Sequence, residues 1–130
     1  MKKLLVIGAT GLLGKATIKY FKTKKNWVCA GLSRRPHEIR NVEYLQGDLL
    51  DKGSIDRLHS RLRDVTHVLY AALYEMDDLL IGWRHTEQIK TNTLMFQNLI
   101  NALSLYSPKL RHLSILQGTK AYGIHVEPMK

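Results

Sequence analysis

Residues 3–14 read KLLVIGATGLLG, and this stretch decides the fold of the chain. Its first part is a continuous apolar run that ends at a glycine, which is typical of a buried strand in a parallel sheet. Glycines then recur at every third position, at Gly8, Gly11 and Gly14. Because these glycines follow a predicted strand and open a predicted helix, the pattern predicts a loop whose backbone amides bind phosphate groups.

Each glycine has a separate predicted role in such a loop. Gly8 permits the tight turn, Gly11 lets the backbone approach a pyrophosphate, and Gly14 allows the helix to pack closely on the strand. The alternative is a glycine-rich strand–helix turn with no ligand. The candidate cofactor-binding residues of this loop are Gly8, Thr10, Gly11, Leu12, Leu13 and Gly14.

Strands and helices alternate along the rest of the chain. Helical periodicity predicts a helix after the glycine loop, a second helix at 51–62 and a long third helix between 78 and 106. This order favours an α/β fold, a Rossmann-type doubly wound parallel sheet with helices on both faces. The second half of that fold is incomplete, so we expect residues 1–130 to form one incomplete nucleotide-binding domain without a substrate domain. Apolar runs predict the remaining strands at 27–32, 42–45, 66–72 and 110–116.

Apolar spacing also predicts which helix faces are buried, because residues three and four apart lie on one side of a helix. In the first helix the predicted face consists of Leu13, Ala16, Thr17, Tyr20 and Phe21. In the long helix the predicted stripe consists of Ile89, Thr93, Phe96, Ile100 and Leu103.

The composition restricts the class of protein. The chain has 130 residues, 45% of them hydrophobic, which suits one ordinary globular domain. Its single cysteine, Cys29, excludes an internal disulfide and a multi-cysteine metal centre, and the dispersed histidines show no metal-ligand spacing. No apolar run approaches the ~20 residues needed to span a bilayer, and the glycine spacing argues against a secretory signal. We therefore expect a cytoplasmic protein with no metal site and no membrane association.

The net charge points to an anionic partner without identifying it. The chain carries 20 Lys and Arg residues against 11 Asp and Glu residues, a formal charge of +9. The basic residues are spread along the chain and form no recognised nucleic-acid motif, so nucleic-acid binding is a remote alternative. One cluster, Ser33-Arg34-Arg35, differs because it falls at the end of the second predicted strand.

That position decides dinucleotide specificity in this fold. An NAD-preferring domain carries an Asp or Glu that binds the ribose hydroxyls, whereas this chain has Ser33, Arg34 and Arg35. A guanidinium presents a planar fork to a 2′-phosphate, and serine adds a hydroxyl donor. The sequence therefore predicts NADP(H) in preference to NAD(H); the alternative is a basic loop before Pro36. Asp48, after the third strand, is expected either at the adenine edge or as the cap of the following turn.

Further motifs agree with a known family. Gly8-x-x-Gly11-x-x-Gly14 occurs together with Gly47-Asp48-Leu49, with Ala71-Ala72 and with Asn92. With these features the chain resembles the extended short-chain dehydrogenase/reductase family, of the NAD-dependent epimerase/dehydratase type. Residues 116–123, LQGTKAYG, look like its progesterone 5β-reductase/iridoid synthase-like branch, and the resemblance is to a truncated member. The resemblance implies a homodimer, NADPH-dependent reduction of activated carbon–carbon double bonds, and three more candidate cofactor-binding residues, Leu49, Ala71 and Ala72.

The same resemblance supplies three candidate catalytic residues. Reducing an enone leaves negative charge on the carbonyl oxygen, which Lys120 in the Gly-x-Lys segment would help to stabilise. Tyr122 does not match the Tyr-x-x-x-Lys pair of most members, because Val126 stands four places on, and the tyrosine of the branch lies in a segment that this chain lacks. Asn92 has the helical phase to point inward. The alternatives are a solvent-facing Lys120, a structural Tyr122 and an Asn92 amide that binds loop backbone.

The sequence thus predicts the cofactor-binding portion of an NADPH-dependent oxidoreductase that reduces an activated C=C bond or a carbonyl of a small molecule. A non-catalytic or regulatory NADP(H)-binding module is the alternative. Because the catalytic tyrosine of the branch is missing, we expect little or no turnover by these 130 residues alone.

Overall fold

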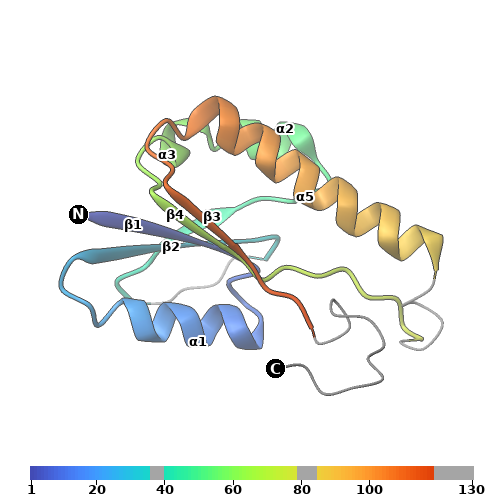
Figure 1. Cartoon of the computed structure of the whole chain (residues 1–130), viewed down its shortest axis with the longest axis horizontal. Helices are drawn as coiled ribbons and strands as arrows, with labels where there is room; N and C mark the ends of the chain where they lie inside the picture. Colours follow the sequence, from blue (N-terminus) through green and yellow to red (C-terminus); the bar gives the residue numbers. More distant parts are fainter. Residues whose placement is uncertain (36–39, 79–84, 119–130) are drawn as a thin grey trace, which may run out of the picture.

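Five parallel strands form one sheet in the order β3-β2-β1-β4-β5 (Figure 1). The computed structural model describes residues 1–35, 40–78 and 85–118. The predicted α/β class with a Rossmann-type, doubly wound sheet is confirmed. The strands are β1 (Lys2–Ile7), β2 (Trp27–Ser33), β3 (Glu43–Gln46), β4 (His67–Tyr70) and β5 (His112–Ile115).

Two strands are shorter than the sequence predicts. β4 ends at Tyr70 rather than at residue 72, and β5 lies inside the predicted range 110–116. Backbone pairing nevertheless continues for one residue, since the Ala71 amide donates to the Ile7 carbonyl at 2.9 Å. The apolar run thus extends beyond the regular strand, because the chain after β4 stays against the end of β1.

Helices cover both faces of the sheet (Figure 1). α1 (Leu12–Phe21) lies on one face, and α2 (Lys52–Asp56), α3 (His59–Leu62) and α5 (Thr86–Tyr106) lie on the other. This division follows from right-handed crossovers, which place the helix after β1 and the helices after β3 and β4 on opposite sides.

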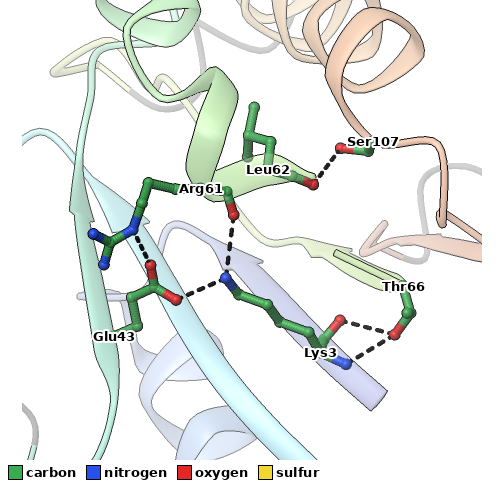
Figure 2. A network of polar contacts seen from close by, with 6 residues as sticks. All are labelled: Lys3, Glu43, Arg61, Leu62, Thr66 and Ser107. Atoms are coloured by element: carbon green, nitrogen blue, oxygen red, sulfur yellow. Dashed lines mark hydrogen bonds and ion pairs between the residues drawn. The ribbon is translucent and has the colours of Figure 1, made fainter. Parts of the chain in front are cut away.

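The single helix predicted at 51–62 is wrong, because it breaks into α2 and α3. The Leu58 amide donates to the Ile55 carbonyl at 2.9 Å, a tighter turn than the α-helical pattern. The end of α3 is tied to the end of α5, where the buried Ser107 hydroxyl donates to the Leu62 carbonyl at 3.0 Å (Figure 2).

β1 contributes to both hydrophobic cores because its side chains alternate between the faces of the sheet. Leu5 and Ile7 join the core that includes the buried apolar residues of α5. Leu4 and Val6 join the core that includes Ile18 of α1. Each of these side chains is almost completely buried, and burying one such side chain stabilises the fold by about 1.5–3 kcal/mol. The central strand therefore holds the two helical layers together.

The predicted buried face of α1 is right at Phe21, which packs against the core, but as a whole it has the wrong helical phase. Gly14 and Ile18 are the buried residues of α1, whereas Leu13 and Tyr20 are 57% and 58% exposed. The cause is Gly14, because a Cβ at that position would lie 2.2 Å from the carbonyl oxygen of Gly8. The first turn of α1 therefore packs backbone against backbone on the end of β1, and this contact sets which residues face the sheet.

The predicted stripe on α5 is also wrong at its amino-terminal end. Ile89 is 56% exposed and Thr93 is exposed, although Leu103 is buried as predicted. The reason is that the amide side chains of Gln88 and Asn92 bind loop backbone and so take the inner positions. The buried residues of α5 are Gln88, Leu99, Ala102 and Leu103.

A polar network joins β1, β3 and α3 near the amino-terminal end of the sheet (Figure 2). The carboxylate of Glu43 lies 2.7 Å from the Lys3 ammonium and 2.5 Å from Nε of Arg61. Lys3 also donates to the Arg61 carbonyl at 3.1 Å, and its own carbonyl accepts from the Thr66 hydroxyl at 3.1 Å. Burial acts to raise the pKa of Glu43, but the hydrogen bonds and charges of Lys3 and Arg61 outweigh it and lower that pKa.

We predict that Glu43 makes the stability of the protein sensitive to acid. A lowered native pKa means that the carboxylate stabilises the fold above its ordinary pKa of 4.5, and that this contribution is lost as the pH falls through the lowered value. Glu43→Gln should reduce the free energy of unfolding by about 1–3 kcal/mol at neutral pH and by much less near pH 3. Urea unfolding at both pH values checks this, and an equal loss at both would contradict it.

A second prediction concerns the contact between α1 and β1. Gly14→Ala should destabilise the fold by about 3 kcal/mol or more, because its Cβ would overlap the Gly8 carbonyl and backbone cannot move aside easily. Gly118→Ala is the matched control, since a Cβ there meets nothing within 4 Å. Thermal unfolding of both variants makes the comparison. A Gly14→Ala variant as stable as the control would show that the first turn of α1 can shift.

Candidate functional site

A cavity of about 580 Å³ opens where the carboxyl ends of β1, β2, β3 and β4 meet. The strand order reverses beside β1, since β2 and β3 extend to one side and β4 and β5 to the other. Ligands in open α/β sheets bind outside the carboxyl ends of the strands at such a switch point. The predicted cofactor-binding residues that line the cavity are Gly8, Thr10, Gly11, Ser33, Arg34, Arg35, Asp48, Leu49, Ala71 and Ala72.

The glycine loop forms one wall of the cavity, and side chains at Gly8 and Gly14 would collide with neighbouring backbone. Gly8 has a φ of +81°, and a Cβ there would lie 2.9 Å from the backbone of Ala71 and of Ala72. The Gly11 amide donates to the Gly8 carbonyl at 3.0 Å, which closes the turn. Gly8 therefore lets the ends of β1 and β4 approach each other, and Gly14 does the same for α1.

The start of α1 is suited to an anion. Gly11 is the N-cap, and no side chain caps the helix. The first amides of a helix have no partner within the helix, and the helix dipole favours negative charge there. A diphosphate fits this uncapped end, because the bare backbone of Gly11 faces the cavity. Leu12, 86% exposed, and Leu13 do not line the cavity with their side chains, nor does Gly14.

The wall beyond β2 carries the positive charge. Arg34 and Arg35 are exposed and line the cavity, and within the described ranges no carboxylate forms an ion pair with either guanidinium. The Ser33 hydroxyl, which the sequence suggests as a ligand donor, donates to the Arg35 carbonyl at 2.7 Å and also contacts the Tyr44 hydroxyl. The arginine side chains are thus the groups on this wall that remain available to an anion.

Asp48 caps a turn, as one of the two sequence-based interpretations predicts; the interpretation that places it at the adenine edge stays a prediction. Its Oδ1 accepts from the Leu50 amide at 2.9 Å, which caps the following turn, and the residue also lines the cavity. Leu49 lines the cavity too, although it is almost fully buried. The backbone carbonyl of Leu49 accepts from Nδ2 of Asn98, in the side chain of that residue of α5, at 2.8 Å. The segment after β3 is therefore held against α5.

The chain after β4 forms the third wall, and two amides of α5 hold it. Asn92 accepts from the Tyr74 amide and donates to the Tyr74 carbonyl, both at 2.8 Å, and also donates to the Gln88 carbonyl at 2.9 Å. Gln88 accepts from the Met76 amide at 2.8 Å. Asn92 does not line the cavity, so the geometry matches the alternative interpretation of a buried amide that binds loop backbone. Gln88 is not among the residues that the sequence predicts for the site, although its spacing of four from Asn92 places both amides on one face of the helix.

The other candidate residues and sites receive little support from the structure. Lys120 and Tyr122 lie outside the described residues. No cluster of metal-binding side chains occurs in the described part of the chain. Cys29 is buried, and burial raises the pKa of its thiol, so the residue acts as a small core side chain. None of the helices in the described ranges is long and apolar enough to span a membrane.

Solved structures share this architecture. A short chain dehydrogenase family protein from Francisella tularensis superposes with a TM-score of 0.74 at 16% identity, covering 97% of this chain and 55% of that one. A short-chain dehydrogenase/reductase superfamily protein from Agrobacterium tumefaciens with bound NAD gives a TM-score of 0.70 at 20% identity, covering 93% and 34%. At these identities the likeness establishes the fold alone.

Sequence comparison is more specific. The chain is 30% identical over 135 residues to an (S)-8-oxocitronellyl enol synthase of Catharanthus roseus, covering 97% of this chain and 32% of that protein. It is 30% identical over 126 residues to a 3-oxo-Delta(4,5)-steroid 5-beta-reductase of Arabidopsis thaliana, covering 91% and 31%. The chain thus spans about a third of the length of these curated relatives. The model of the NAD dependent epimerase/dehydratase family matches residues 4–128. Relatives, structures and family model agree with the glycine loop and the sheet order, and the chain belongs to the NAD dependent epimerase/dehydratase family.

Proposed function

We propose that this chain is the NADP(H)-binding part of an oxidoreductase that reduces an activated C=C bond or a carbonyl of a small molecule. The observation that carries the proposal is the cavity at the carboxyl ends of the strands, which has the glycine loop on one wall and Arg34 and Arg35 on another. A dinucleotide presents a diphosphate and an adenosine ribose in one molecule, and these two walls offer groups for both.

The preference for NADP(H) is supported by charge. The amides at the start of α1 would bind the diphosphate, which both nicotinamide dinucleotides share. Only NADP(H) carries a 2′-phosphate, and Arg34 and Arg35 offer it two guanidiniums that no described carboxylate neutralises. An acidic residue at the same place would favour the free ribose hydroxyls of NAD(H). When bound, the dinucleotide supplies the hydride.

The substrate class is supported by the relatives. One of them is named as a reductase of 3-oxo-Delta(4,5)-steroids, substrates in which a double bond lies beside a ketone. Reduction of such a bond develops negative charge on the carbonyl oxygen, and we propose Lys120, with a lesser role for Tyr122, to stabilise it. Asn92 would act only through the loop that it holds.

The cofactor assignment is tested by titrating NADPH and NADH separately in a calorimeter. The protein should bind NADPH more tightly, and Arg34→Ala with Arg35→Ala should weaken NADPH about 10–100-fold while leaving NADH nearly unchanged, since charge-assisted contacts are lost. Arg111→Ala, just before β5, is the matched control for charge. Equal affinity of the unaltered protein for both nucleotides would overturn the assignment. Tight NADPH binding by the whole protein without reduction of any enone or carbonyl would point to a regulatory module.

Two further parts of the proposal concern the cell and the assembly. We propose a cytoplasmic location, which the unpaired Cys29 thiol supports because reduced cysteine suits that compartment. We propose a homodimer, as the family resemblance implies. Cell fractionation and light scattering of the whole protein test these points; a secreted protein or a monomer would overturn them.

A further inference from the structure

We infer that Tyr44 and Gln46 of β3 are positioning residues that fix the backbone of Arg34 and Arg35, and that they thereby set the selectivity of the cavity for a 2′-phosphate. This inference rests on the proposed function, because it assigns to two residues the geometry on which NADP(H) recognition would depend. Neither residue lines the cavity, so neither would touch the cofactor itself.

The hydrogen bonds start where the regular sheet stops. The last paired residues of β2 and β3 are Ser33 and Gln46, and beyond them the Gly47 amide donates to the Ser33 carbonyl at 3.0 Å. Beyond this point, side chains of β3 bind the backbone that follows β2. Gln46 Nε2 donates to the Arg34 carbonyl at 3.2 Å. The Tyr44 hydroxyl donates to the Arg35 carbonyl at 2.5 Å, and the same carbonyl accepts from the Ser33 hydroxyl at 2.7 Å.

The Tyr44 ring packs against the core, and this contact positions the hydroxyl that binds the Arg35 carbonyl. The ring lies on the α1 side of the sheet, beside Gly31, the partner of Tyr44 on β2. A Cβ on Gly31 would lie 3.8 Å from the Tyr44 ring and 2.7 Å from the Ala9 side chain. Because Gly31 has no side chain, the ring lies beside the backbone of β2. An aromatic side chain has only two rotatable angles, so holding its hydroxyl in place costs little conformational entropy. Burial also raises the pKa of the Tyr44 hydroxyl, which therefore keeps its proton as a donor at neutral pH.

Fixing the backbone matters because no described residue fixes the arginine side chains themselves. Arg34 and Arg35 form no ion pair within the described ranges. A loop that is already ordered loses less conformational entropy when an anion binds, and this difference appears as affinity. The glycine loop follows β1 and is closed by its own backbone contacts. Loss of the hydrogen bonds from Tyr44 and Gln46 should therefore weaken binding of the 2′-phosphate and spare binding of the diphosphate.

The experiment compares NADPH with NADH on Tyr44→Phe and Gln46→Ala in the whole protein by calorimetry. Each variant should weaken NADPH about 3–10-fold, the value expected for one hydrogen bond, and change NADH less than about twofold. Tyr106→Phe is the matched control, because its hydroxyl bonds Asp56 at 3.2 Å on the opposite face of the sheet. Tyr44→Phe keeps the ring, so folding should be retained, and thermal unfolding verifies this.

A second measurement separates positioning from a general structural role. In a protein that already carries Arg34→Ala and Arg35→Ala, Tyr44→Phe should have no further effect on NADPH, because the groups that it positions are gone. The same variants can be titrated with adenosine 2′,5′-bisphosphate, which isolates the 2′-phosphate from the nicotinamide. A preference for NADPH that Tyr44→Phe leaves intact, or an equal loss for both nucleotides, overturns the positioning role and leaves the proposed function standing. Absence of any NADPH preference in the unaltered protein overturns both.

Discussion

The structure depends on one close approach, that of three backbone segments around Gly8. The end of β1, the first turn of α1 and the chain after β4 meet there with no space for a Cβ, since one on Gly14 would lie 2.2 Å from the Gly8 carbonyl and one on Gly8 would lie 2.9 Å from Ala71. Because backbone cannot move aside as a side chain can, this contact fixes both the distance and the rotation of α1. The start of α1 is uncapped beside the cavity because its N-cap, Gly11, has no side chain.

The two ends of the sheet differ in how their charged side chains are paired. At the carboxyl ends of the strands the backbone stays open and two arginines lie unpaired by any described carboxylate. Near the amino ends, the Glu43 carboxylate pairs with both Lys3 and Arg61, so charge there contributes to stability (Figure 2). The formal charge of +9 is therefore less informative than its distribution, because Arg34 and Arg35 are the positive charges that line the cavity.

Two walls of the cavity, the chain after β2 and the chain after β4, are held in the same way. Each is an irregular segment whose backbone groups have no partner in the sheet, and polar side chains of a neighbouring regular element bind those groups instead. Tyr44 and Gln46 of β3 do this for the chain after β2, and Gln88 and Asn92 of α5 do it for the chain after β4. Irregular backbone can line a site in this way without becoming loose.

The sequence alone determined the element types, the α/β class and the place of the cavity, because glycine spacing and apolar runs act locally on the backbone. It also located Arg34 and Arg35 at the end of β2. It did not determine the buried faces of α1 and α5, the break between α2 and α3, or the partners of Asn92, Gln88, Tyr44 and Gln46. Those depend on contacts between residues distant in the chain: the Gly8–Gly14 approach rotates α1, and loop carbonyls and amides draw polar residues of α5 inward. Periodicity records which residues share a helix face, and only tertiary packing decides which face is buried.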